Sequence, residues 1–228
     1  MIARIRTKLV ILTALVMMPA MALAFDVVPT VTVMELPRDI RGATIVVSNP
    51  RTVPLPISVE IVEREVNEDG TEKQTPADEL FRIFPAQAII EPGKRQTIRV
   101  IWQGPALQKS RSFTLYAGEV PVDVTSGTAS GVQRILRIGA SVHVAPGGTT
   151  AAPRVAQAVP EGNGVRVTLA NDGSRFIYMN DISLAFAGKT IPGPELARIA
   201  ERTLLTPGSR RSFVIPDVAG TPELRVAD

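Results

Sequence analysis

The feature that most constrains the fold is a long alternating stretch over residues 132–144, which reads V-Q-R-I-L-R-I-G-A-S-V-H-V. Every second residue is apolar on one side, interrupted only by Arg134, while the other side is mostly polar. Side chains alternate between the two faces of a strand, so the pattern predicts a strand with one apolar stripe. At about 3.3 Å per residue it would run roughly 40 Å, far beyond the usual strand length. A small β domain can cover only part of it.

Residues 1–24 have the pattern of a secretory signal peptide. Three basic residues precede an apolar run over 9–23, which is too short for a comfortable membrane span and leads into an A-x-A cleavage pattern at 22–24. We therefore expect an exported protein located in the periplasm, with an uncleaved anchor as the alternative. No second apolar run approaches membrane length, which predicts no integral membrane anchoring of the product.

The charge balance changes once the signal is removed. The chain has 25 Lys+Arg and 22 Asp+Glu, and loss of the three basic residues of the signal leaves 22 against 22. A neutral mature chain has no basic excess to neutralise phosphates, so we expect no nucleic-acid partner and no anionic membrane surface. Cysteine is absent, which excludes a disulfide scaffold and a cysteine nucleophile and remains compatible with the periplasm.

Two halves of the mature sequence repeat the same arrangement. A strand, an Asn turn and a second strand at 44–63 recur at 165–186, and a Pro-Gly turn that leads into an alternating strand at 92–100 recurs at 207–215. Repetition of this kind predicts two related β-sandwiches in tandem, although similar turns also arise by chance in β proteins. We expect an N-terminal domain over 25–145 and a C-terminal domain over 146–228.

The sequence also predicts a short helix and the surroundings of the only tryptophan. Residues 194–203 are the only stretch of the mature chain with helical spacing, which predicts one or two amphipathic turns, with a covering loop as the alternative. Trp102, the only tryptophan, stands at a strand end. We expect its ring in a core or at the domain junction, and a ligand surface is the alternative.

No group of catalytic or metal-binding residues stands out. His143 is the only histidine, whereas a metal site needs two or more His or Cys, and a triad needs a buried acid and an exposed serine. Alternation places His143 on the polar side of the long strand, where a structural role is expected. Glu60, Glu63, Glu65 and the acidic turn at 67–70 are interpreted as a solvated face, because they lack calcium-loop spacing. We predict no enzyme activity, no metal and no cofactor.

Four segments together carry a family resemblance. They are R-G-A-T-I-V-V-S-N-P at 41–50, F-P-A-Q-A-I-I-E-P-G-K-R-Q-T-I-R-V at 84–100, Y-A-G-E-V-P at 116–121 and R-I-L-R-I-G-A-S-V-H-V-A-P at 134–146. In these segments the chain resembles the periplasmic chaperones of chaperone/usher pilus assembly, the PapD-like proteins, and within them the archaic, Csu-like class. The second segment is the most specific of the four.

The resemblance implies an all-β fold of two tandem immunoglobulin-like β-sandwich domains in a boomerang arrangement. It also implies a chaperone that binds and stabilises pilin-like subunits by donor-strand complementation and delivers them to an outer-membrane usher. In this mode the first domain lends its last strand to a subunit that lacks one. The long stretch agrees on independent grounds, because it has an apolar stripe, exceeds its own sheet and follows a polar, small-residue loop at 121–131.

The donor strand is assigned to the apolar stripe, with Val132, Leu136 and Ile138 filling the subunit groove and Arg134 meeting a polar position in it. The main chain of residues 130–139 would complete the hydrogen-bond ladder of the subunit, which otherwise exposes strand edges that invite aggregation.

The chain departs from the family at the carboxylate anchor. Well-known members hold the terminal carboxylate of the pilin with an Arg from the first strand and a Lys from the last. Here Ser141 occupies the Lys position, and the first strand offers no Arg. Arg137 is the substitute candidate for this anion contact, and a solvated arginine on the sheet face is the alternative.

Two other classes of function remain open from the sequence. One is a tandem immunoglobulin-like structural or adhesive component of a surface assembly without chaperone activity. The other is a hydrolase that would need a triad through His143. Self-pairing of the free protein, which would hide the apolar stripe, is also left open.

Overall fold

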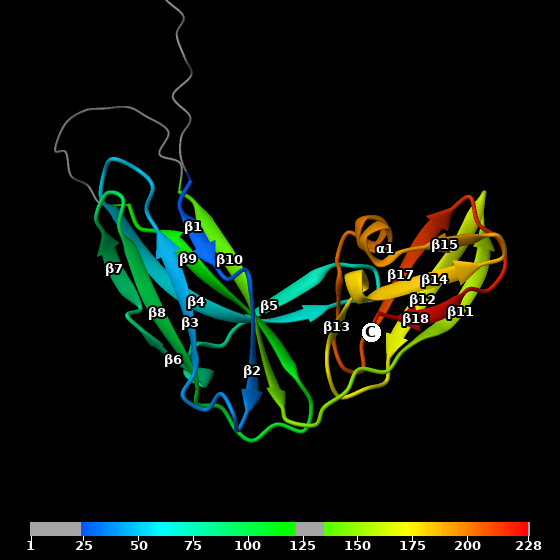
Figure 1. Ribbon diagram of the computed structural model, residues 1–228, viewed down its shortest axis with the longest axis horizontal. Helices are drawn as coiled ribbons and strands as arrows, with labels where there is room; N and C mark the ends of the chain where they lie inside the picture. The colour runs from blue at the N-terminus through cyan, green and yellow to red at the C-terminus, as the bar shows by residue number, and fades with distance from the viewer. Residues whose placement is uncertain (1–23, 122–134, 228) are drawn as a thin grey trace, which may run out of the picture.

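The computed structural model describes residues 24–121 and 135–227. The chain forms two β lobes that meet at an angle, with the first lobe in blue to green and the second in yellow to red (Figure 1). The all-β, two-lobed prediction is therefore confirmed. Val132, Arg134 and residues 1–23 of the predicted signal lie outside the described residues. The predicted domain boundary at 146 falls at the last residue of a strand.

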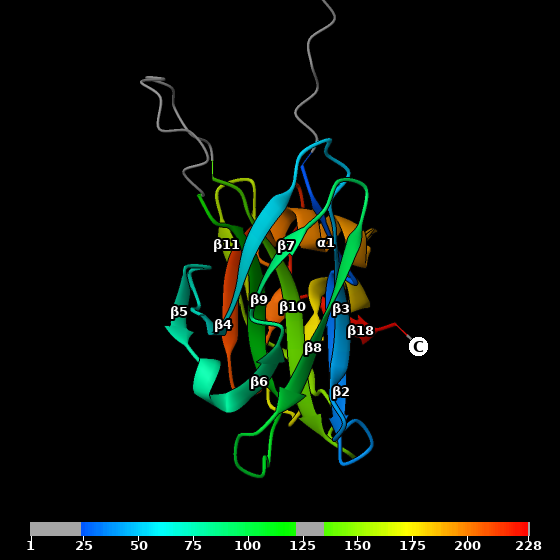
Figure 2. The same ribbon diagram turned by 90° about the vertical axis from the view of Figure 1, so that its left-hand side faces the viewer.

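Two packed sheets build the first lobe, which faces the viewer in Figure 2. The first sheet has the order β1-β3-β8-β6 and the second has the order β2-β10-β9-β4-β5, with β7 also paired to β4. The strands are β1 (Asp26–Val28), β2 (Val31–Leu36), β3 (Ala43–Ser48), β4 (Leu55–Val66), β5 (Glu72–Pro76), β6 (Phe81–Phe84), β7 (Gln87–Ile90), β8 (Arg95–Trp102), β9 (Arg111–Glu119) and β10 (Arg137–Pro146), with the short 3-10 helix η1 (Asp78–Leu80) before β6.

Alternating apolar residues of these strands form the first core. Ile57 and Ile61 of β4 and Phe113 and Leu115 of the neighbouring β9 belong to one continuous cluster. The period-two alternation read from the sequence places these side chains on the inner faces of the sheets. Trp102 packs against this cluster, with its ring centroid 5.1 Å from that of Phe81 and 5.8 Å from that of Phe113. The core position expected for Trp102 is therefore found.

The second lobe has its own core between smaller sheets. Its strands are β11 (Pro153–Glu161), β12 (Gly164–Asn171), β13 (Ile177–Tyr178), β14 (Ile182–Phe186), β15 (Lys189–Ile191), β16 (Leu204–Leu205), β17 (Arg210–Pro216) and β18 (Glu223–Val226), with η2 (Met179–Asp181) and α1 (Gly193–Ala200). They pair as β11-β12-β17, β13-β16 and β15-β14-β18. Helix α1 overlaps the stretch predicted to be helical, begins one residue before it, and buries Leu196 and Ala197 in this core.

A buried asparagine organises the first lobe at the start of the Asn turn. The side-chain amide of Asn49 donates to the carbonyls of Val53 and Ile90, at 2.8 Å in each case. The main-chain N–H of Gly93, in the Pro-Gly turn, donates to the carbonyl of Asn49 at 2.8 Å. Asn49 therefore ties the Asn turn to the Pro-Gly turn.

The second lobe repeats this pattern at Asn171. The side-chain amide of Asn171 donates to the carbonyls of Arg175 at 2.7 Å and Leu205 at 3.2 Å, and Gly208 of the second Pro-Gly turn donates to the carbonyl of Asn171 at 2.7 Å. The sequence repeat is thus a repeat of hydrogen bonding, in which each buried amide satisfies main-chain carbonyls that would otherwise be unpaired.

The junction between the lobes is packed, and it includes the only histidine. His143 is fully buried, on the side of β10 that alternation predicts to be polar. Its ring stacks on Phe176 of the second lobe at 3.8 Å between centroids, because this end of β10 is covered by the second lobe. Nearby, Val66, Phe176 and Leu204 form a small apolar cluster that joins the two lobes.

The acidic stretch is only partly the solvated face that was expected. Glu63 forms two hydrogen bonds with Arg111, at 2.7 and 2.5 Å, and Glu65 pairs with Lys73. Across the described residues there is no group of three or more His, Cys, Asp or Glu that could hold a metal ion. The turn at 67–70 differs more from the expected solvated turn, because it is the tip of the β4–β5 hairpin and contacts the second lobe.

None of the helices in the described ranges is both long enough and apolar enough to span a membrane.

Candidate functional site: an open strand edge and a polar pocket

Strand β10 has two halves with different surroundings. Residues 141–144 lie between β9 on one side and β2 on the other, and residues 145–146 pair with β2. Residues 137–140 pair with β9 alone, because β2 begins opposite Ser141 and the preceding β1 has joined β3 in the other sheet. Within 24–121 and 135–227, no strand covers the second edge of residues 137–140. The structure therefore leaves an open main-chain edge at the start of β10.

The direction of the main-chain groups follows from two hydrogen bonds. The N–H of Ser141 donates to Thr30 on the β2 side at 2.8 Å, whereas the carbonyl of Leu136 accepts from Glu119 on the β9 side at 2.9 Å. Successive residues of a strand point their N–H and C=O groups to opposite edges. Arg137 and Gly139 therefore direct their main-chain donors and acceptors toward the open edge.

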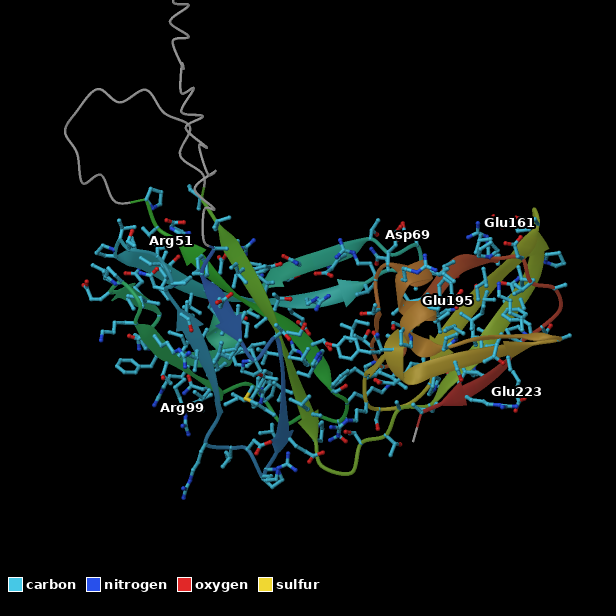
Figure 3. The ribbon with its side chains drawn as sticks, turned by 45° about the horizontal axis from the view of Figure 1, so that its top comes forward. Arg51, Asp69, Arg99, Glu161, Glu195 and Glu223 are labelled. Carbon is cyan, nitrogen blue, oxygen red and sulfur yellow. The ribbon has the colours of Figure 1, made fainter. Side chains whose placement is uncertain are left out.

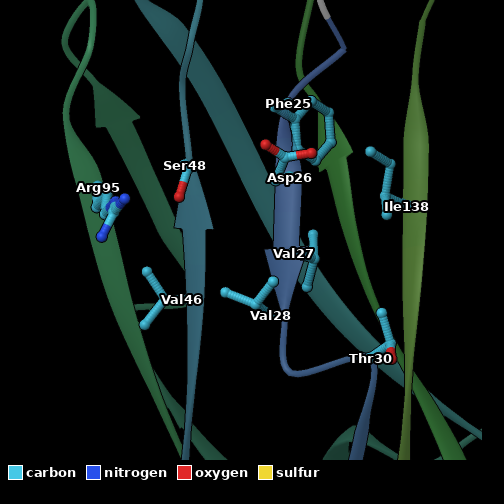
Figure 4. Close-up of a pocket in the computed structure, with 9 residues that line it drawn as sticks. All are labelled: Phe25, Asp26, Val27, Val28, Thr30, Val46, Ser48, Arg95 and Ile138. Carbon is cyan, nitrogen blue, oxygen red and sulfur yellow. The ribbon is translucent and has the colours of Figure 1, made fainter.

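An apolar margin lies beside this edge. Leu136 and Ile138 are half-buried and pack against the first core. Ile138 lines an open cavity of about 520 Å³ together with Phe25 and Val27 of the first strand. Figure 4 shows Ile138 facing these two residues across the gap between β1 and β10. The two sheets are thus incompletely closed where the open edge begins.

The structure describes two of the four predicted donor residues, Leu136 and Ile138. Leu136 and Ile138 are partly buried against their own core, and Ile138 also lines the open cavity. Val132 and Arg134 lie outside the described residues. The donor-strand assignment stays a prediction for all four residues, with its geometry at Leu136 and Ile138 now defined.

Arg137 projects on the opposite face of β10. Its guanidinium carbon lies 3.6 Å from the ring centroid of Tyr116, and it forms an ion pair with Glu60. The side chain is exposed, so it is accessible to an anion, but an incoming carboxylate would compete with Glu60. Its role as the carboxylate anchor stays a prediction.

A polar pocket of about 470 Å³ adjoins the same face of β10. It is lined by Arg64, Glu72, Gln74, Thr114, Tyr116, Gly139, Ser141 and Arg202. Arg64 forms a two-pronged ion pair with Glu72, at 3.2 and 2.9 Å, and donates to the Ser141 hydroxyl at 3.1 Å. Gln74 donates to Glu72 at 2.7 Å and to the Tyr116 hydroxyl at 2.8 Å.

The electrostatics of this pocket favour an anion. Burial raises the pKa of the Glu72 carboxyl, but the hydrogen bonds from Arg64 and Gln74 and the charges of Arg64 and Arg202 outweigh it, so its pKa lies below the ordinary value. Glu72 is therefore ionised and balances Arg64. Arg202, from the second lobe, makes no ion pair within 4 Å in the described part of the chain, which leaves the pocket with a positive charge.

Sequence reasoning missed Arg64 and Arg202. Arg64 could have been found from the pairing of the strands at 55–66 and 113–120, which brings their outward residues onto one face with the start of the long strand. Arg202 could not, because it reaches the pocket only through the packing of the two lobes.

His143 does not form a catalytic centre. Its Nδ1 lies 2.8 Å from the Ser112 hydroxyl, and its Nε2 lies 2.7 Å from the Tyr178 hydroxyl. No carboxylate is among these partners, and both His143 and Ser112 are buried. Burial, with smaller contributions from the charges of Arg64 and Arg175, lowers the pKa of the imidazole to about 3. The ring is a neutral structural group of the junction.

Taken together, the fold and the site define a two-lobed β protein that presents one strand with an open edge beside a cationic pocket. Residues 26–149 match the family of pili and flagellar-assembly chaperones, PapD N-terminal domain. The chain belongs to this family, so the predicted resemblance to PapD-like chaperones is confirmed.

Solved structures agree on the fold over most of the chain. The structure of the CsuC–CsuE chaperone–tip adhesion subunit pre-assembly complex of archaic Csu pili from Acinetobacter baumannii matches with a TM-score of 0.59 and 14% identity, covering 89% of this chain and 97% of that chain. The E. coli chaperone DraB matches with a TM-score of 0.58 and 19% identity, covering 89% and 91%.

A third match is to the structure of the Salmonella enterica SafA pilin in complex with the SafB chaperone. It has a TM-score of 0.56 and 17% identity and covers 89% of this chain and 96% of that chain. No protein with a curated functional description matches the sequence. The likenesses establish the two-domain immunoglobulin-like fold.

Proposed function

We propose that this protein is a periplasmic, non-enzymatic chaperone that binds pilin-like subunits by donor-strand complementation and delivers them to an outer-membrane usher. The observation that carries the proposal is the open edge of β10 at residues 137–140, which has a strand on one side only. Membership of the chaperone family supports the chaperone role. Periplasmic localisation and usher delivery rest on the family and on the predicted signal.

The open edge supplies the main-chain part of recognition. Arg137 and Gly139 each offer one donor and one acceptor to an added strand. A subunit that lacks a strand has unpaired main-chain groups along its groove, and burying them without partners costs about 1–3 kcal/mol for each group. Pairing with β10 removes this cost, and strand addition of this kind gives affinity that depends little on sequence.

The apolar margin supplies the side-chain part. Leu136 and Ile138 are half-buried in the free protein, so they can gain further contact when a subunit packs beside them. Fully burying such a side chain contributes about 1.5–3 kcal/mol, and these residues gain only the part that is still exposed. Val132 and Arg134 would extend the stripe toward the N-terminal end of the strand.

For the terminal carboxylate of a subunit, we propose Arg137 as the contact, with the adjoining polar pocket as the source of further positive charge. Arg202 is exposed and lines this pocket, whereas Arg64 is already balanced by Glu72. A carboxylate near β10 could therefore meet Arg137 from the first lobe and Arg202 from the second.

The test places one charge on either face of the same segment. Leu136→Glu puts a carboxylate at the apolar margin, where an unpaired charge is costly. Ile135→Glu is the matched control, because Ile135 is 56% exposed. Each variant is co-expressed in the periplasm with a pilin-like β subunit that lacks one strand, and co-purification is measured.

We expect Leu136→Glu to reduce capture at least tenfold and Ile135→Glu to leave it nearly unchanged. Circular dichroism of each purified variant shows whether its own fold is intact. Equal capture by both folded variants would contradict strand donation at this margin. Failure of the parent protein to capture the subunit would instead favour a structural or adhesive role for the tandem domains.

A further inference from the structure

A single buried arginine joins the two lobes. Arg211, at the start of β17, is only 2% exposed. Its Nη1 donates to the carbonyls of Asn67 at 3.1 Å and Glu68 at 3.3 Å, both at the tip of the β4–β5 hairpin of the first lobe. Its Nη2 donates to the carbonyls of Ala200 at 2.9 Å and Arg202 at 3.4 Å, at the end of α1 in the second lobe.

This arrangement needs a guanidinium group. Burial lowers the pKa of Arg211 from its ordinary value, and no carboxylate lies within 4 Å of it in the described residues. A buried charge is costly unless hydrogen bonds compensate for it. Arginine offers five donors in a planar fork and can reach carbonyls in two directions, whereas lysine has one compact ammonium group. The four carbonyls accept from the two terminal nitrogens of this fork, while Nε is buried without a partner among the described residues.

The hairpin tip is shaped to receive this side chain. Gly70 has a φ of +92°, and a Cβ atom at this position would lie 2.6 Å from Nη1 of Arg211. The N–H of Ser212 donates to the carbonyl of Glu68 at 2.8 Å, which adds a main-chain bond between the lobes. In Figure 3 Asp69 marks the tip where the hairpin reaches the second lobe. The turn that reads as an acidic loop in sequence is thus a docking element.

The same contact reaches both walls of the polar pocket. The two strands of the docked hairpin carry Arg64 on β4 and Glu72 on β5, while the backbone held by Nη2 carries Arg202. Arg211 does not line the pocket itself. It holds the backbone from which the two sides of the pocket project.

We propose that Arg211 is a positioning residue that fixes the angle between the lobes and thereby sets the separation of the Arg64–Glu72 pair from Arg202 across the pocket. Its consequence for subunit binding rests on the proposed function. Its effect on the angle between the lobes does not. The two consequences can therefore be tested separately.

The first arm measures the geometry directly. The chain has no cysteine, so spin labels can be attached at Thr97→Cys and Thr190→Cys, two exposed positions in different lobes. Electron–electron double resonance then gives the distribution of distances between the lobes. We expect a narrow distribution for the parent protein and a broader or shifted one for Arg211→Lys and for Gly70→Ala.

The two variants disturb one contact from opposite lobes. Gly93→Ala is the matched control for Gly70→Ala, because Gly93 has a φ of +68° and a Cβ atom there would meet nothing within 4 Å. It imposes similar backbone strain in the first lobe without touching the junction. Circular dichroism confirms that each lobe is folded. If Arg211→Lys and Gly70→Ala both keep the parent distribution, the positioning role is refuted.

The second arm measures subunit capture with the strand-lacking subunit used above. We expect Arg211→Lys and Gly70→Ala to weaken the affinity at least tenfold, and Gly93→Ala to leave it within twofold of the parent value. If the geometry changes but the affinity does not, the pocket is not part of subunit recognition, and that half of the proposal is overturned. If the parent protein captures no subunit, the proposed chaperone function fails, while the distance measurement still decides the role of Arg211.

Discussion

The buried histidine gives a sharp prediction about pH. Burial lowers the pKa of His143 to about 3 in the folded protein, from an ordinary value of 6.5. The folded state therefore binds fewer protons than the unfolded state between these values, so stability is fully present above about pH 6.5 and falls as the pH falls toward 3. The slope is about 1.4 kcal/mol per pH unit, which gives a loss of about 2 kcal/mol at pH 5.

The assay is urea unfolding followed by the fluorescence of Trp102, the only tryptophan, which reports on the lobe that carries His143. Because His143 is also the only histidine, it should dominate the change in stability between about pH 7 and 5. His143→Gln keeps a polar side chain that can bond to Ser112 and Tyr178 but cannot titrate. We expect this variant to be less stable at neutral pH and to lose most of the slope.

A parent protein with equal unfolding free energies at pH 7 and pH 5 would refute the reasoning, because it would mean that His143 accepts a proton in the folded state. A His143→Gln variant with the same slope as the parent would refute it as well. In that case other groups would cause the pH dependence.

Three more predictions test separate parts of the structure. Asn49→Ala should lower the unfolding free energy by about 2–3 kcal/mol in urea titrations, because it leaves the buried carbonyls of the two turns without their donors. A loss below about 0.5 kcal/mol would count against the role of Asn49 in joining the two turns. Glu201 has a φ of +57°, so Glu201→Gly should raise the thermal midpoint, corresponding to roughly 1 kcal/mol, and a lowered midpoint would argue against strain. Glu60→Gln should release Arg137 from its ion pair and tighten the binding of a subunit with a terminal carboxylate several-fold, as measured by calorimetry. An unchanged affinity would contradict the hypothesis that Arg137 anchors the carboxylate.

Much of the fold could be predicted because its signals are local. Strict alternation at 55–61 and 138–144 gives the faces of β4 and β10, since strand side chains alternate whatever the strand packs against. The repeated Asn and Pro-Gly turns predicted the tandem arrangement, and the structure shows the cause in the matching hydrogen bonds of Asn49 and Asn171. Helix α1 was visible from the helical spacing of its apolar residues.

Only the part of the site that follows from the local pattern of one strand, β10, could be predicted from the sequence. The long stripe indicated that β10 exceeds its sheet. The open edge arises because β1 pairs with β3 in the other sheet and the chain joins the sheet of β10 only at β2, which alternation cannot show. Arg202 and Arg211 act across the junction of the lobes, and the environment of His143 is set there too. Contacts between distant segments leave no periodic signal in the sequence, so these roles needed the structure.

The central claim is that β10 keeps an open main-chain edge in the free protein, and amide hydrogen exchange resolved by residue tests it most directly. The N–H groups of Ile138 and Ala140 face β9 and should be protected, whereas those of Arg137 and Gly139 face the open edge and should exchange rapidly, becoming protected when a subunit binds. Slow exchange at Arg137 and Gly139 in the free, monomeric protein would contradict the account.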